Sequence, residues 1–244
     1  MVIELIPLFI GVFLVAVLYS SVGHAGASGY IAVMSLAGLA PESIRPMALA
    51  LNVLVAGIAT WQFVRAGHFR WPLFWPFALT AVPSAFIGGY FRLPDSLFQQ
   101  LVGAVLIGAA IQLLWQVRAT RHRRAIKPGL ALLVGAGLGL LAGLTGTGGG
   151  IFLTPLLLVM AWSDSKEAAA VSAPFILLNS IAGLAGIHLG LWTLPAYMPG
   201  LMVTVVAGGA IGSHWGSYRL GHTGIRRLLA CVLMVAGLKF IWYS

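Results

Sequence analysis

The sequence predicts an all-α, polytopic membrane protein built from two inverted repeats, each opening with a glycine-broken helical hairpin. Of the 244 residues, 60% are hydrophobic and 8% are charged, and the mean hydropathy is +0.99. A soluble domain carries about 25% charged residues, so this chain lacks the side chains for a water-exposed surface. Its long apolar runs show no apolar/polar alternation, which favours membrane-spanning helices over a barrel.

Eight apolar segments follow one another along the chain, at 3–40, 44–64, 72–92, 97–117, 129–162, 167–188, 194–215 and 224–242. Six have the length of one membrane span, about 20 residues. The segments 3–40 and 129–162 are too long, and small residues interrupt them at 23–29 and 143–150. Because glycine permits a sharp backbone break, each is predicted to form two helical arms. The first segment has no basic flank or cleavage site, so we expect it to be a retained span.

The two long segments open two matching halves. Glycines of the first break recur at a constant offset of 120, pairing Gly23 with Gly143, Gly26 with Gly146, Gly29 with Gly149, and the nearby Ile31 with Ile151. Further on, Asn52 matches Asn179 at an offset of 127. The chain is therefore predicted to consist of a first transmembrane repeat at 1–120, a basic cytoplasmic linker at 121–127 and a second repeat at 128–244.

The distribution of positive charge predicts the orientation of the halves. If each long segment crosses the membrane once, eight Lys and Arg lie inside and six outside; if each is a hairpin that returns to its starting side, the numbers are eleven and three. The second arrangement follows the positive-inside rule better and makes the halves inverted, as in many transporters. The net charge of +9 is then explained by anchoring at the cytoplasmic (inner) membrane, and nucleic acid is not an expected partner.

The two breaks are the predicted binding site for a small anionic substrate. A break inside the bilayer frees backbone N–H groups at the start of the next arm, and these attract an anion without a buried cation. The candidate residues are His24, Ser28, Gly29, Asn52, Thr145, Thr147, Gly148, Gly149, Gly150 and Asn179. For the glycines the alternative is tight helix packing, and for the two asparagines it is an interhelical hydrogen bond. All five acidic residues lie at segment ends or in loops, which argues against a carboxylate relay and a cation substrate. No ligand spacing indicates a metal site or another cofactor.

The second half resembles the sulfite exporter TauE/SafE family of bacterial membrane permeases. The resemblance lies in the glycine-rich run 143–150, then the stretch 151–157 with its Pro-Leu-Leu, then Ala168 to Ser172 leading to Asn179-Ser180. The first half matches less closely, since it has Gly26-Ala27-Ser28-Gly29 where the family has a Gly-Gly-Gly run. The resemblance implies export of sulfite, sulfonates or related organosulfur anions across the inner membrane, without enzymatic activity.

Two other functions compete with transport. The stretch Gly26-Ala27-Ser28-Gly29 also resembles the serine motif of rhomboid intramembrane proteases, with Ser28 as nucleophile. Against this, the motif lies on the first segment, and the second break contains no serine. A non-transporting membrane scaffold would tolerate bulky residues at both breaks. A homodimer is compatible with so small a permease, although no interface motif requires it.

Overall fold

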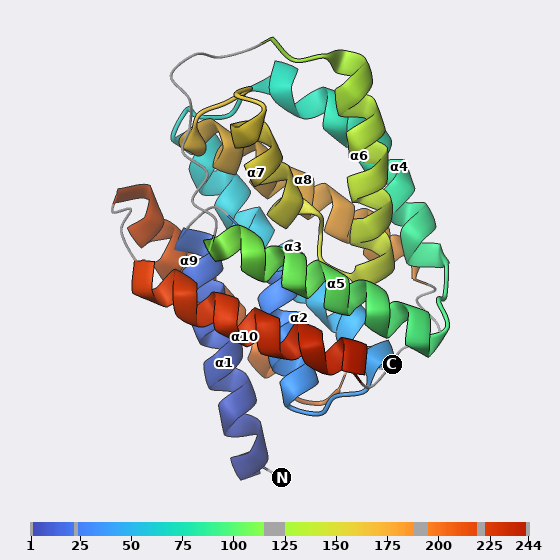
Figure 1. Cartoon of the computed structure of the whole chain (residues 1–244). Coiled ribbons are helices and arrows are strands. Elements are labelled where there is room, and N and C mark those ends of the chain that lie inside the picture. The colour runs from blue at the N-terminus through green and yellow to red at the C-terminus, as the bar shows by residue number, and fades with distance from the viewer. Residues whose placement is uncertain (1, 22–23, 115–124, 188–194, 219–222, 243–244) are drawn as a thin grey trace.

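The computed structural model describes residues 2–21, 24–114, 125–187, 195–218 and 223–242. These residues form helices joined by short loops (Figure 1). The helices in chain order are α1 (Val2–Ser21), α2 (Ala27–Leu36), α3 (Pro41–Arg65), α4 (Trp71–Tyr90), α5 (Asp95–Leu114), α6 (Pro128–Thr145), α7 (Gly150–Val159), α8 (Ser165–Gly186), α9 (Met198–Tyr218) and α10 (Thr223–Trp242). The predicted polytopic helical fold is confirmed.

Both long segments are broken where the glycines predict it. The first break precedes α2 at Gly26, which has a φ of 99°. The second lies between α6 and α7, and Gly146, Gly148 and Gly149 have φ values of 80°, 74° and 75°. These left-handed conformations are unfavourable for side chains with a Cβ, which explains the glycines. The arms α2 and α7 have 10 residues each, or about 15 Å, roughly half the thickness of a bilayer core.

Four helices of the described part of the chain are long and apolar enough to cross a membrane. They are Glu42–Arg65, Trp71–Tyr90, Pro128–Thr145 and Ser165–Gly186. Trp61 and Trp71, near the facing ends of α3 and α4, are 68% and 62% exposed. Exposed tryptophans at helix ends are typical of a membrane interface.

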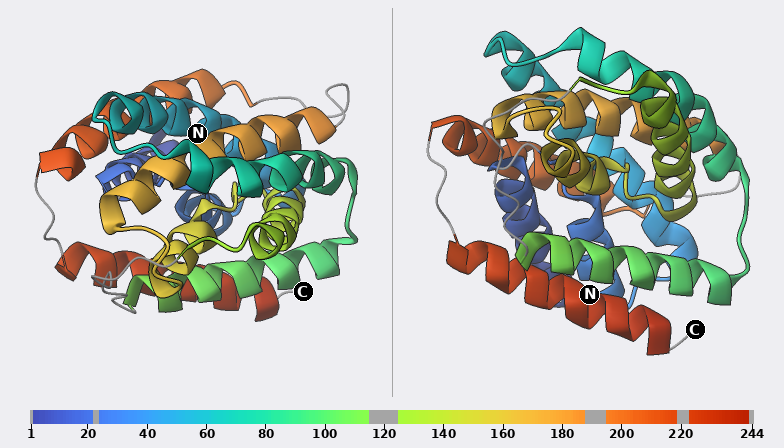
Figure 2. Two further views of the ribbon diagram at one scale, coloured as in Figure 1. Left: turned by 90° about the horizontal axis from the view of Figure 1, so that it is seen from above. Right: turned by 45° about the horizontal axis from the view of Figure 1, so that its top comes forward.

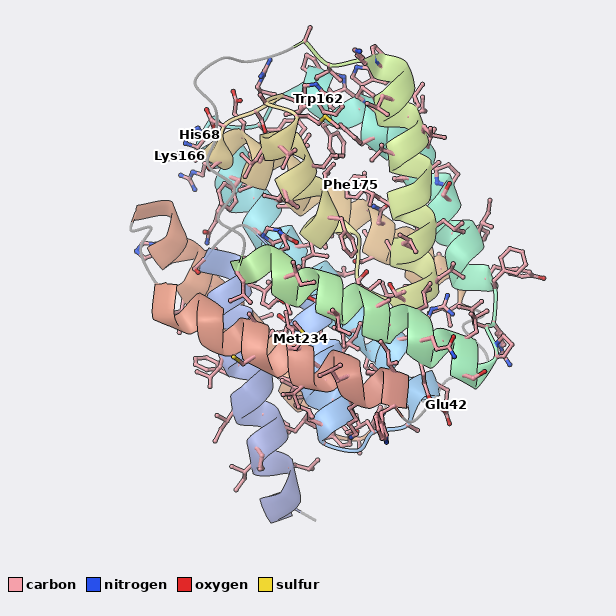
Figure 3. The ribbon with its side chains drawn as sticks, in the orientation of Figure 1. Glu42, His68, Trp162, Lys166, Phe175 and Met234 are labelled. Atoms are coloured by element: carbon pink, nitrogen blue, oxygen red, sulfur yellow. The ribbon has the colours of Figure 1, made fainter. Side chains whose placement is uncertain are left out.

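The two broken hairpins enter the molecule from opposite ends. Figure 1 shows α1 starting at the bottom and α6 starting at the top, with α2 in the lower part and α7 in the upper part. One apolar core surrounds α1, α2 and the helices near them, and a second one, with Trp162 and Phe175, lies around α4, α6, α7 and α8 (Figure 3). The first hairpin therefore packs in the first core and the second hairpin mainly in the second, although Ile151 at the start of α7 belongs to the first core.

Helices α4 and α6 pack closely in parallel. A side chain at Gly135 would collide with the carbonyl of Phe77, and one at Gly143 would collide with the carbonyl of Ala85. Residue numbers rise together along the two helices, so they run in the same direction. Helices α1 and α9 form a second closely packed parallel pair, with Gly208 against Phe13 and Gly212 against Val17.

Two further helix pairs are antiparallel. Helices α5 and α10 lie side by side in every view (Figure 2). Along them Gly103 lies near Ile241 and Gly237 near Ile107, so this pair is antiparallel. Helices α3 and α8 cross in the middle of the molecule, again in antiparallel directions, because Leu49 contacts Gly183 and Asn52 contacts Ser180.

Polar contacts at the helix ends distinguish the two membrane arrangements. Arg70, before α4, forms an ion pair with Glu167, at the start of α8, at 3.4 Å. Figure 3 shows His68 and Lys166 together on that side, with Glu42 at the other end. One crossing per long segment would place the loops 65–70 and 163–166 on opposite sides, so this contact agrees with the hairpin arrangement.

The close approach of α4 and α6 gives a first testable prediction. A side chain at Gly139 would collide with the backbone of Ala81, whereas the space beside Gly137 is open. Gly139→Leu is expected to separate the helices and to lower the thermal unfolding temperature in detergent, because close backbone contact drives helix association in lipid. Gly137→Leu is the matched control, and equal unfolding temperatures for the two variants would contradict the packing.

Candidate functional site

The crossing of α3 and α8 holds the two asparagines that the sequence singled out. Asn52 on α3 donates from Nδ2 to Ser180 Oγ at 3.3 Å, and Asn179 is the chain neighbour of Ser180. All three side chains have a relative exposure of 0%. Two amides and a hydroxyl of α3 and α8 are therefore buried, and the contact of Asn52 with Ser180 marks the point where the two helices cross. Amides in such surroundings face protein or water and not lipid.

The second break lies directly against this crossing. Asn52 Nδ2 is also 3.5 Å from the carbonyl oxygen of Thr147, a long hydrogen bond. A Cβ at Gly148 would lie 2.6 Å from Asn52 Nδ2 and 3.1 Å from Ser180 Oγ. The hydroxyls of Thr145 and Thr147 bond to each other at 2.9 Å. The structure thus brings together the predicted residues Asn52, Thr145, Thr147 and Gly148.

Several side-chain atoms of the two asparagines have no hydrogen-bond partner within the described protein. They are Asn52 Oδ1 and both Oδ1 and Nδ2 of Asn179. Leaving such an atom buried and unpaired costs about 1–3 kcal/mol. A group held at that cost in a protein interior indicates a water or a ligand, and here it offers both donors and acceptors.

The first break is arranged differently. The hydroxyl of Ser28 bonds to that of Tyr19 at 2.8 Å, and the ring of His24 packs edge-on against the Tyr19 ring at 6.4 Å. A Cβ at Gly29 would lie 2.5 Å from the side chain of Val15. Ser28 and Gly29 thus have their partners on α1, so for Gly29 the packing alternative applies. Ser28 bonds to a tyrosine, which does not provide the base that a protease needs.

The start of α7 combines tight packing with an uncapped end. Gly149 fits beside Ala142 and Phe175, and a side chain at Gly150 would collide with Ile176. The N-caps of α2 and α7, Gly26 and Gly149, provide no side-chain hydrogen bond. In contrast, α8 begins outside the core with a complete capping box between Asp164 and Glu167. The two short arms therefore begin in the interior without the side-chain acceptor that usually satisfies first-turn N–H groups.

Arg45 is a residue whose role the sequence reasoning missed. The hairpin arrangement predicts it to be one of the three outer charges, with Arg92 and Lys239, but it lies in α3 with only 9% exposure. Its guanidinium donates four hydrogen bonds to backbone carbonyls: to Gly143 from Nε at 2.9 Å, to Phe91 from Nη1 at 3.1 Å, and to Gly88 and Gly89 from Nη2 at 2.6 and 2.8 Å. The available signal was an arginine placed beside a proline at the start of an apolar run.

Comparison with known proteins agrees with this architecture. The family model described as "Sulfite exporter TauE/SafE" matches residues 8–240. The chain belongs to this family. It is also 40% identical over 247 residues to "Probable membrane transporter protein y4hK" of Sinorhizobium fredii (strain NBRC 101917 / NGR234), covering 98% of this chain and 99% of the relative. No solved structure matches the chain.

Membership in the TauE/SafE family makes this chain a multi-pass membrane transporter. The family is one of membrane transporters and implies no enzymatic activity, so the protease alternative loses its basis. The bacterial relative is consistent with an inner-membrane location. A transporter of this family has a small-molecule substrate and is surrounded by membrane lipid.

Proposed function

We propose that this TauE/SafE family member exports small organosulfur anions, such as sulfite or sulfonates, across the cytoplasmic membrane. The observation that carries the proposal is the buried amide of Asn52, which contacts the second break and Ser180, together with the buried amide of Asn179, which has no partner in the described protein. The amide N–H groups of Asn179 would bind the oxygens of a sulfonate or sulfite group. Asn52 would hold the break through Thr147 and present its free oxygen to a donor on the substrate.

The electrostatics of the crossing favour a singly charged substrate. In the described part of the chain, Arg45 and Glu167 are the buried residues with full charges, and both bond elsewhere. The attraction for an anion therefore comes from amides and from helix starts, each equivalent to about half a charge. Burying a doubly charged ion without a matching cation costs far more than burying a single charge. Sulfonates should be carried much better than sulfate.

Transport by this route requires the halves to be inverted repeats, which is part of the proposal. Two features support it. The hairpins enter from opposite ends, and the parallel pair α4–α6 has its counterpart in α1–α9. Two arrangements of similar energy would then expose the crossing alternately to either side, as rocking of one repeat against the other does in transporters of this type.

Flux into liposomes tests this function directly. The purified protein would be reconstituted, and uptake of hydrogen sulfite and methanesulfonate, which are singly charged, would be compared with that of chloride and sulfate and with protein-free vesicles. We expect saturable flux for hydrogen sulfite and methanesulfonate and at least tenfold less for the sulfate dianion. Flux of chloride alone would refute the substrate, and absence of flux for every anion would favour a scaffold. Direction is tested by export from cells loaded with a sulfonate.

A further inference from the structure

Arg45 connects two helix ends that would otherwise repel each other. Because α4 and α6 run parallel, their C-terminal ends lie side by side, and each end carries partial negative charge and unpaired carbonyls. Arg45 donates to the carbonyls of Gly88 and Gly89 on α4, to that of Phe91, which directly follows α4, and to that of Gly143 on α6. The cation therefore satisfies both ends at once.

The same arginine also contacts the second break. Gly143 lies three residues before Gly146, where the helical path ends. A Cβ at Gly146 would lie 3.1 Å from both the side chain and the carbonyl oxygen of Arg45. Seven residues further along α3, on the same face two turns away, Asn52 reaches Thr147. One face of α3 thus contacts the break at its beginning and near its middle.

This brace belongs to one half of the protein. At the offset that relates Asn52 to Asn179, the position equivalent to Arg45 is Ser172. Its hydroxyl bonds to that of Thr154 at 2.7 Å. A serine cannot join two helix ends as a guanidinium does, so the two breaks are supported by different means.

We infer that Arg45 is a positioning residue, which fixes the second break against Asn52 and so sets the affinity for the transported anion. Arg45 acts by holding the backbone and not by binding the anion itself, because four of the five N–H groups of its guanidinium donate to backbone carbonyls. The inference rests on the proposed function, since it assigns the support of the same site. Lysine keeps the charge but has a single nitrogen, so it cannot span both helix ends as the planar fork does.

The test compares Arg45→Lys and Arg45→Gln with the wild-type protein in the liposome assay. We expect the substrate concentration at half-maximal flux to rise at least tenfold for Arg45→Gln and severalfold for Arg45→Lys. The matched control is Arg70→Gln, which removes an arginine from an ion pair at the opposite side and should keep the wild-type value. Thermal unfolding of each purified variant is measured in parallel.

The outcomes distinguish a failure of the inference about Arg45 from a failure of the proposed transport function. A purely structural role for Arg45 would lower the unfolding temperature and the yield but leave the half-saturating concentration of the inserted protein unchanged, which would overturn the inference. Arg45→Lys retains the buried charge, so it answers the question if Arg45→Gln fails to fold; a wild-type value for Arg45→Lys also overturns it. Absence of flux in the wild-type protein refutes the proposed function instead.

Discussion

Replacing Gly148 with alanine is expected to abolish transport while leaving the protein in the membrane. Two effects add at this position. Its φ of 74° is left-handed, which costs a residue with a Cβ about 1–2 kcal/mol. The new methyl group would also lie 2.6 Å from Asn52 Nδ2 and 2.9 Å from Ile176, so the break must move away from the crossing. We expect at least a tenfold loss of sulfonate flux per inserted protein, measured in liposomes.

The matched control for this variant is Gly38→Ala. Gly38 follows α2 and has a similar φ of 78°, but no atom lies within 4 Å of the position of its missing Cβ. It carries the same backbone strain without the contact with the site. Wild-type flux for Gly38→Ala together with loss for Gly148→Ala assigns the effect to the crossing. Wild-type flux for both variants would show that the second break is not part of the transport path.

Replacing Asn179 with leucine is expected to remove transport without lowering stability. Both polar atoms of the Asn179 side chain are buried and have no partner within the described protein. An unpaired buried group costs about 1–3 kcal/mol, so an apolar side chain of similar size should be neutral or stabilising. Flux should nevertheless fall at least tenfold, because the donor for the anion is lost. The measurements are thermal unfolding in detergent and flux in liposomes.

A binding role and a structural role for Asn179 predict different changes in the unfolding temperature. If Asn179 binds the anion, flux falls while the unfolding temperature stays the same or rises. If Asn179 serves only as an interhelical hydrogen bond, its replacement lowers the unfolding temperature, and flux falls only in proportion to the folded protein. Gln112→Leu is the control, because Gln112 Oε1 on α5 is also buried without a partner and lies outside the crossing. Like Asn179→Leu, Gln112→Leu should leave the unfolding temperature unchanged or raise it, but it should also leave flux unchanged.

The sequence alone determined the class of the fold and the places where helices end. Nineteen charged residues among 244 leave the bilayer as the only suitable solvent, and the bilayer in turn requires helices. The breaks followed from Gly26, Gly146, Gly148 and Gly149, because glycine adopts left-handed conformations most readily. Such local requirements depend on the residue type alone, so they can be predicted without knowing which residues lie nearby in the folded protein.

The sequence marked residues of the proposed site where polarity conflicts with position, and it gave less information elsewhere. Asn52 and Asn179 are the chain's two asparagines, and each is anomalous inside an apolar helix, which marked them in advance. For Gly29 a binding role and a packing role produce the same small residue. Only its position against Val15 favours packing. The charge count predicts only that Arg45 is an outer charge, because nothing nearby in sequence indicates bonds to carbonyls 43 to 98 residues away.

Tertiary structure therefore decided which of the marked residues meet. The crossing of α3 and α8 places Asn52 beside Ser180, and the parallel packing of α4 on α6 brings two helix ends to Arg45. These meetings depend on how whole helices pack, and packing in lipid is set by shape complementarity between distant segments. Residue type fixed the breaks and the buried amides, and only the packing of distant helices brought them together in the proposed site.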